Sequence, residues 1–109
     1  MAGINRLQEK EFEKMLEEAT IDCYSEYEEF SGIETALDDE LEFPFDALVL
    51  GRQAKITGVD SDKSSLRAGI IMKAEIDGKK HAVALTMIDI EDKDSKNAKW
   101  LGAVKWWMR

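Results

Sequence analysis

The chain has 109 residues, a formal net charge of −8 and a single cysteine. The length favours one domain over residues 1–109, and a lone cysteine excludes an internal disulfide. The acidic excess argues against nucleic-acid and membrane-surface partners, which are themselves negatively charged. Because we find neither the apolar run of a signal peptide nor a stretch long enough to span a bilayer, we expect a cytoplasmic, bacterial-type soluble protein.

Residues 1–42 are expected to be helical. Apolar residues at helical spacing predict a first helix over residues 5–19 and a second over residues 22–41. Gly32 predicts a break or kink in the second helix, at a cost of about 1 kcal/mol relative to alanine. Pro44 ends the helical region, because the residue before a proline is pushed toward extended backbone. The apolar stripe of the second helix would consist of Tyr24, Tyr27, Phe30, Ile33, Leu37 and Leu41.

Residues 43–109 are expected to be mainly β. The apolar period changes to two after Pro44 and predicts five short strands, over residues 45–50, 53–59, 66–76, 79–85 and 87–91. Asp77-Gly78 predicts a tight hairpin turn. The tryptophan-rich tail, residues 99–109, would form a helical turn or a closing strand. The expected fold is α+β, with N-terminal helices packed on a small SH3-like antiparallel β-barrel.

The acidic charge is concentrated in one segment. No lysine or arginine occurs between Lys14 and Arg52, and this interval holds twelve of the 23 acidic residues. Two carboxylates ~5 Å apart at an effective dielectric near 20 repel by roughly 3 kcal/mol. A bound hard cation removes that repulsion, and calcium accepts about 6–8 oxygen ligands in a flexible shell. The segment therefore suggests a calcium site.

The spacing of the carboxylates selects the candidate ligands. On a helix, Asp22, Glu26 and Glu29 would share one face, and Asp38 and Glu42 repeat the four-residue step near the helix end. Asp46 follows on the other side of the turn at Pro44. Charge alone does not separate a metal site from a solvated acidic helix face, because exposed carboxylates can spread apart in water. The candidate metal ligands are Asp22, Glu26, Glu29, Asp38, Glu42 and Asp46.

The sequence gives little support for an EF-hand or for a catalytic site. The loop beginning at Asp60 starts like an EF-hand, but Ser65 replaces the required glycine and Ile71 the bidentate glutamate, so a polar loop is the better interpretation. We expect His81 to be a partly buried sheet residue. Cys23 has acidic neighbours that raise a thiol pKa, and we interpret it as a packed residue rather than a nucleophile. A second, weaker cation site could involve Asp89, Glu91, Asp92 and Asp94.

One family resemblance emerges from these residues. The string from Asp22 to Glu29, then Gly32, then Leu41-Glu42-Phe43-Pro44-Phe45-Asp46-Ala47, resembles the small bacterial calcium-binding proteins of the CcbP type, first described in cyanobacteria. The resemblance implies helices packed on a small β-barrel and calcium binding without an EF-hand. It also implies ligands on the acidic helix and around the Phe-Pro-Phe turn: Asp22, Glu26, Glu29, Glu42 and Asp46.

The sequence thus predicts a non-enzymatic protein that binds calcium reversibly, as a cytoplasmic buffer or sensor. The alternative is an acidic interaction module whose carboxylate face meets a basic protein partner without metal. An enzyme using paired carboxylates is the weakest option, because Glu26 and Glu29 lack an apolar pocket to separate their pKa values.

Overall fold

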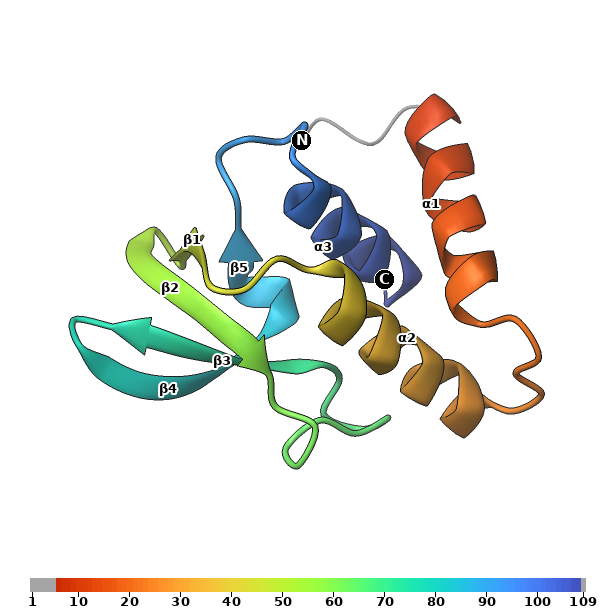
Figure 1. Cartoon of the computed structure of the whole chain (residues 1–109), viewed down its shortest axis with the longest axis horizontal. Coiled ribbons are helices and arrows are strands. Elements are labelled where there is room, and N and C mark those ends of the chain that lie inside the picture. Colours follow the sequence, from red (N-terminus) through yellow and green to blue (C-terminus); the bar gives the residue numbers. More distant parts are fainter. Residues whose placement is uncertain (1–5, 109) are drawn as a thin grey trace.

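The computed structural model describes residues 6–108 and shows three helices and a five-stranded antiparallel sheet. The α+β class is therefore confirmed. The elements in chain order are α1 (Arg6–Ala19), α2 (Glu26–Glu40), β1 (Phe45–Val49), β2 (Arg52–Val59), β3 (Ile71–Ile76), β4 (Lys79–Ala84), the 3-10 turn η1 (Leu85–Met87), β5 (Ile88–Asp89) and α3 (Lys96–Trp107). The sheet and the helices form separate layers (Figure 1). Among the described helices, none is long and apolar enough to cross a bilayer.

The strand order is β4-β3-β2-β1-β5. Two-residue turns join β1 to β2 and β3 to β4, whereas residues 60–70 form a longer loop between β2 and β3. Asp77 and Gly78, with φ values of 53° and 77°, connect Ile76 to its register partner Lys79. Paired positive φ values match the twist of the flanking strands, so the predicted hairpin turn is confirmed. The third strand begins at Ile71 rather than at residue 66, because residues 65–69 form a turn closed by the Ser65–Gly69 bridge, with Gly69 at a φ of 84°.

The expected barrel is not formed, and the sheet of the described residues stays open. β4 pairs only with β3, and β5 pairs only with β1 through two residues. Closure would require these two edge strands to meet. Instead β5 is very short, and residues 79–82 of β4 are exposed and include Lys79 and Lys80, which keep this edge in water.

α2 begins at Glu26, four residues later than expected. Ser25 has extended backbone and its hydroxyl accepts a hydrogen bond from the Glu28 N–H at 3.2 Å, which caps the helix. Asp22 instead lies in the α1–α2 turn with φ of 62°, a conformation that aspartate tolerates. The expectation that Asp22 shares a helix face with Glu26 and Glu29 is therefore wrong.

Gly32 does not interrupt α2, which is continuous through it. Its lack of a side chain lets α2 pass close to the end of α1. A Cβ at this position would lie 2.6 Å from the Ala19 carbonyl oxygen and 3.3 Å from the Cys23 Sγ. The glycine is a packing requirement, not a kink.

Gly32→Ala should destabilise the protein, although alanine is the better helix former by about 1 kcal/mol. The methyl group would push against backbone that cannot rotate away, so we expect a net loss of about 1–2 kcal/mol in the free energy of unfolding, measured by urea denaturation. Ser31→Ala, at the exposed neighbouring position, serves as the control and should be neutral or slightly stabilising. Equal stability of Gly32→Ala and the parent would show that the helices separate at no cost.

The core lies between the sheet and the helices. Alternate strand residues such as Ala54, Ile56 and Met72 face inward and pack with Ile33 and Leu37 of α2. α1 lies on the far side of α2 and α3 from the sheet (Figure 1).

The first two residues of the expected α2 stripe do not belong to the core. Tyr24 is 86% exposed and Tyr27 is 75% exposed, and the buried stripe begins at Phe30. The sequence prediction for these two tyrosines was therefore wrong.

The tail forms a helix of 12 residues, more than the single turn or closing strand expected from the sequence. Ser95 caps α3 by accepting a hydrogen bond from the Ala98 N–H at 3.1 Å. Trp100, Trp106 and Trp107 are half-buried against the core, and the Trp106 ring lies 6.3 Å from the Phe12 ring of α1. The expected start of the first helix at Asn5 and the final residue of the tail lie outside the described residues.

Candidate functional site

The six candidate ligands divide between the two ends of α2. Asp22, Glu26 and Glu29 lie at its N-terminal end, and Asp38, Glu42 and Asp46 lie at or beyond its C-terminal end. Glu26 and Asp38 are twelve residues apart on one helix, about 18 Å along its axis. Calcium–oxygen distances are about 2.3–2.6 Å, so the two groups cannot share an ion.

The N-terminal group has a structural explanation that needs no metal. Glu26 and Glu29 lie in the first turn of α2, where negative charge interacts favourably with the helix dipole. Glu26 is exposed and Glu29 is half-buried. The neighbouring Glu28 closes the cap by accepting a hydrogen bond from the Tyr24 N–H at 2.7 Å.

The C-terminal group is held against a distant part of the chain. The Asn97 side chain accepts a hydrogen bond from the Glu42 N–H at 2.9 Å and donates one to the Glu42 carbonyl at 3.3 Å. Lys96 pairs with Glu40 at 3.1 Å. The start of α3 is thereby fixed beside the α2–β1 turn, in which a cis peptide bond joins Phe43 to Pro44.

Next to this junction, carboxylates from the two segments face one hollow of about 240 Å³. Asp46 comes from β1, and Glu91 and Asp92 come from the loop between β5 and α3. Gln53 of β2 adds an amide oxygen to the same lining. Pairing of β1 with β5, which places Leu48 opposite Asp89, brings the two segments together.

The side chains that line this hollow offer carboxylate and amide oxygens, which are the ligand atoms that calcium prefers. Asp46, Glu91 and Asp92 are exposed, and none of them takes part in the ion pairs found among the described residues. Within residues 6–108, however, no three histidine, cysteine or acidic side chains already stand close enough to hold an ion. Binding would therefore require exposed side chains to rotate inward.

The second cation site suggested by the sequence is only partly available. Asp89 pairs with Lys105 at 3.1 Å, and the same ammonium group donates to the Ile88 carbonyl. Asp92 organises its own loop, because one carboxylate oxygen accepts from the Asp94 N–H at 3.1 Å. Of these residues, Glu91 and Asp92 meet Asp46, a combination that sequence reasoning missed.

The loop after Asp60 is a polar turn, as expected. The Asp60 carboxylate accepts a hydrogen bond from the Lys63 N–H at 3.3 Å, and the Ser64 hydroxyl donates to the Asp60 carbonyl at 2.8 Å. These bonds organise the loop backbone.

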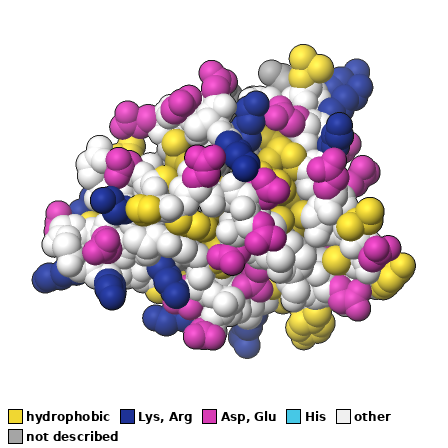
Figure 2. All heavy atoms as spheres, in the orientation of Figure 1, with side chains coloured by type: hydrophobic (Ala, Val, Ile, Leu, Met, Phe, Trp, Pro, Cys, Tyr) yellow, Lys and Arg dark blue, Asp and Glu magenta, His cyan; other side chains and the backbone are white. Residues whose placement is uncertain are grey.

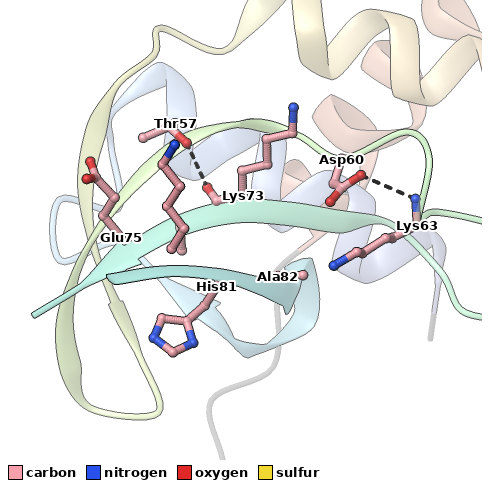
Figure 3. A pocket seen from close by; sticks show the side chains of 9 residues that line it. Thr57, Asp60, Lys63, Lys73, Glu75, His81 and Ala82 are labelled. Atoms are coloured by element: carbon pink, nitrogen blue, oxygen red, sulfur yellow. Dashed lines mark hydrogen bonds between the residues drawn. The ribbon is translucent and has the colours of Figure 1, made fainter. Parts of the chain in front are cut away.

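A larger hollow, about 500 Å³, lies on β2, β3 and β4. Its lining mixes ammonium and carboxylate groups, including Lys73, Lys80 and Glu75 (Figure 3). Such a lining is poorly suited to a cation.

The single histidine and the single cysteine of the chain lie far apart (Figure 1). His81 is on β4 and Cys23 is in the α1–α2 loop, at opposite ends of the molecule (Figure 1). His81 is exposed rather than partly buried, because the β3–β4 hairpin extends past the core, and it points away from Lys73 and Glu75 (Figure 3). Burial, followed by the charges of Glu28 and Glu29, raises the pKa of the Cys23 thiol, as the acidic neighbourhood predicted.

Glu34 on α2 is a carboxylate in an unfavourable setting. Its Oε2 is a buried oxygen without a hydrogen-bond partner among the described residues, and burial raises the pKa of its carboxyl group. At pH values between the ordinary glutamate pKa and the raised folded value, the folded protein therefore keeps a proton that the unfolded chain has released. Its stability should fall as pH rises from the ordinary glutamate pKa through the raised folded value.

Glu34→Gln should remove this pH dependence. At about pH 7 the variant should have a higher free energy of unfolding than the parent, because the amide has no charge to desolvate. Partial access of solvent to Glu34 screens the effect and keeps the gain below about 1 kcal/mol. At about pH 3 or below the two should converge, since the parent is then protonated in both states. Urea midpoints at the two pH values measure this difference, and Asp39→Asn, at an exposed site on the same helix, controls for general charge repulsion. An equal gain in both variants at neutral pH would assign the effect to net charge.

The family model of the CcbP proteins, described as calcium binding, matches residues 13–108. The crystal structure of Anabaena CcbP has a TM-score of 0.81 and 21% sequence identity, covering 99% of this chain and 95% of that one. The structure of a calcium-binding protein in the calcium-binding form has a TM-score of 0.78, with the same identity and coverage. No curated protein sequence matches. The solved structures establish a shared fold.

Proposed function

Because this chain belongs to the CcbP family of calcium-binding proteins, we propose that it binds calcium reversibly, as a cytoplasmic buffer or sensor, through carboxylates that form no EF-hand. Calcium binding itself is the property of the family. The proposal adds the site and the cellular role. It also holds that the protein has no catalytic activity, in keeping with a family of calcium binders.

The proposed main site is the hollow beside the α2–β1 turn. The observation that carries it is the meeting of Asp46 with Glu91 and Asp92 around one concave surface that also presents the Gln53 amide. The backbone beneath is fixed by β1–β5 pairing and by Asn97, so ligand-bearing segments are already positioned. The proposal keeps Asp38 and Glu42, exposed carboxylates at and just beyond the C-terminal end of α2, as outer contributors of negative charge to this site.

Lys55 is a basic residue beside the proposed site, and it takes part in none of the ion pairs found among the described residues. It lies opposite Asp46 in the β1–β2 ladder. An exposed lysine–carboxylate pair contributes only about 0–1 kcal/mol. A divalent ion bound by several carboxylates is favoured over it.

The proposed second site is the N-terminal end of α2, with Asp22, Glu26 and Glu29. We assign it the weaker affinity because Asp22 leaves the helix face and the helix dipole already stabilises the glutamates. An ion there would gain less from relieving repulsion.

Calorimetric titration of metal-stripped protein, with magnesium as the comparison, tests the function. Calcium should bind more tightly than magnesium by about tenfold or more, because an irregular shell from separate segments suits calcium better than the octahedral shell of magnesium. Equal weak affinities for both ions would indicate diffuse charge screening. The protein would then be better described as an acidic interaction module that binds a basic protein partner without metal.

A further inference from the structure

Three large apolar side chains lie exposed in the short segment where α1 connects to α2. Ile21 is 72% exposed, Tyr24 86% and Tyr27 75%. They fall within seven consecutive residues, whereas Leu7 and Leu50, the other strongly exposed apolar residues among those described, lie in separate parts of the chain. Single exposed apolar residues are normal, but grouped ones mark interaction surfaces. We call Ile21, Tyr24 and Tyr27 the aromatic patch.

The backbone that presents the aromatic patch is well held. The Tyr24 N–H donates to the Glu28 carboxylate at 2.7 Å, and the Cys23 N–H donates to the Thr20 carbonyl at 3.0 Å. The Cys23 thiol donates to the Glu28 carbonyl at 3.3 Å. A backbone fixed in this way loses little conformational entropy when a ligand binds.

The exposure of the patch has a local cause. An apolar residue just before a helix cap often packs against the residue five positions later, but Tyr24 finds Glu29 there. The buried stripe of α2 starts only at Phe30. The tyrosines therefore gain no burial within the described chain, although each could contribute a large apolar area.

The rim of the patch is uniformly acidic. Asp22 and Glu28 line a shallow hollow of about 520 Å³ together with Tyr24 and Tyr27, and Glu26 is exposed beside them. Figure 2 shows apolar side chains interspersed with acidic ones at this end of the molecule, without basic side chains among them on the visible face. None of the rim carboxylates takes part in the ion pairs found among the described residues.

We propose that the aromatic patch docks a basic amphipathic segment of another protein. Its apolar face would cover the tyrosines and Ile21, and its lysines or arginines would meet Asp22, Glu26 and Glu28. Tyrosine suits such a contact, because the ring supplies buried area while the hydroxyl remains hydrogen-bonded at the edge. An amphipathic segment laid on an apolar surface with charged flanks is a common recognition mode.

Size and charge argue against two other occupants. At these exposures the three side chains present roughly 400 Å², about half of the ~800 Å² per partner in a stable dimer. A second copy would also bring one acidic rim against another in a chain of net charge −8. The same charge repels an anionic membrane.

The test uses a labelled peptide of about 15 residues, with lysines on one helical face and leucines on the other, titrated by fluorescence anisotropy. Tyr24→Ser with Tyr27→Ser should weaken binding by about tenfold to a hundredfold. Leu7→Ser with Leu50→Ser removes equally exposed apolar residues elsewhere and should leave affinity unchanged. A peptide with glutamates in place of the lysines should not bind. A calcium chelator is present throughout, so the outcome is separate from that of the calcium titration.

Three results would overturn the proposal. Equal loss of affinity in both double variants would indicate attraction by charge alone. No binding by the wild-type protein at about 1 mM peptide would show that the patch does not dock basic segments. Self-association in sedimentation velocity that Tyr24→Ser with Tyr27→Ser abolishes would identify a second copy as the occupant.

Discussion

Addition of calcium to metal-stripped protein should raise its melting temperature. An ion that binds only the folded state adds about 2.7 kcal/mol of stability at a free concentration one hundred times the dissociation constant. For a chain of this length, that corresponds to an increase of roughly 10 °C. The physical source is the relief of repulsion among carboxylates that the fold places around one hollow, Asp46 from the acidic segment and Glu91 and Asp92 from the loop before α3.

Differential scanning calorimetry with millimolar calcium measures the effect, and magnesium and sodium at matched ionic strength serve as controls. Simple screening would raise the melting temperature equally with all three salts. A melting temperature that calcium leaves unchanged would contradict calcium binding to the folded chain.

The second large effect is expected from removing two charges at the proposed main site. Asp46→Asn with Glu91→Gln should weaken the tightest calcium-binding event by about a hundredfold, because it removes one ligand from each of the two segments that meet there. The fold should survive, since both side chains are exposed. The apo variant should be slightly more stable than the apo parent, because like charges have been removed. Isothermal calorimetry of the metal-stripped variants gives both affinity and stoichiometry.

Two charge-matched variants separate position from net charge. Glu26→Gln with Glu29→Gln should remove a weaker binding event and leave the tightest one nearly unchanged. Glu9→Gln with Glu13→Gln removes exposed charges from α1, and should lower affinity only through long-range attraction that added salt screens. Equal loss in all three variants would refute the site assignment. A larger loss of calcium affinity in the variant with Glu26→Gln and Glu29→Gln would show that the N-terminal end of α2 is the tighter of the two sites.

Much of the secondary structure could be predicted from the sequence, because strands and turns depend mainly on neighbouring residues. Period-two alternation after Pro44 and the Asp77-Gly78 pair predicted the strands and the β3–β4 turn within a few residues. The start of α2 was missed. The sequence allows either a helix that begins near Asp22 or a helix capped at Ser25. Only the backbone geometry shows that the cap at Ser25 prevails.

The grouping of carboxylates at the candidate site could not be predicted from neighbouring residues alone. Sequence spacing grouped carboxylates that are near one another along the chain, and a rigid helix then placed those groups about 18 Å apart. It could not associate Asp46 with Glu91 and Asp92, more than forty residues away. That association depends on the pairing of β1 with a strand of only two residues, which carries almost no sequence signal of its own.

Three properties of the protein were determined by the sequence alone. They are the α+β fold class, the acidic segment without basic residues, and the resemblance to calcium-binding proteins. These properties follow from residue types and short-range periodicity, which need no knowledge of distant contacts. Only the tertiary structure decided that the sheet stays open, that two tyrosines of the apparent α2 stripe face water, and which carboxylates meet. Those outcomes depend on which surfaces the other elements cover, because burial and proximity belong to the folded chain as a whole.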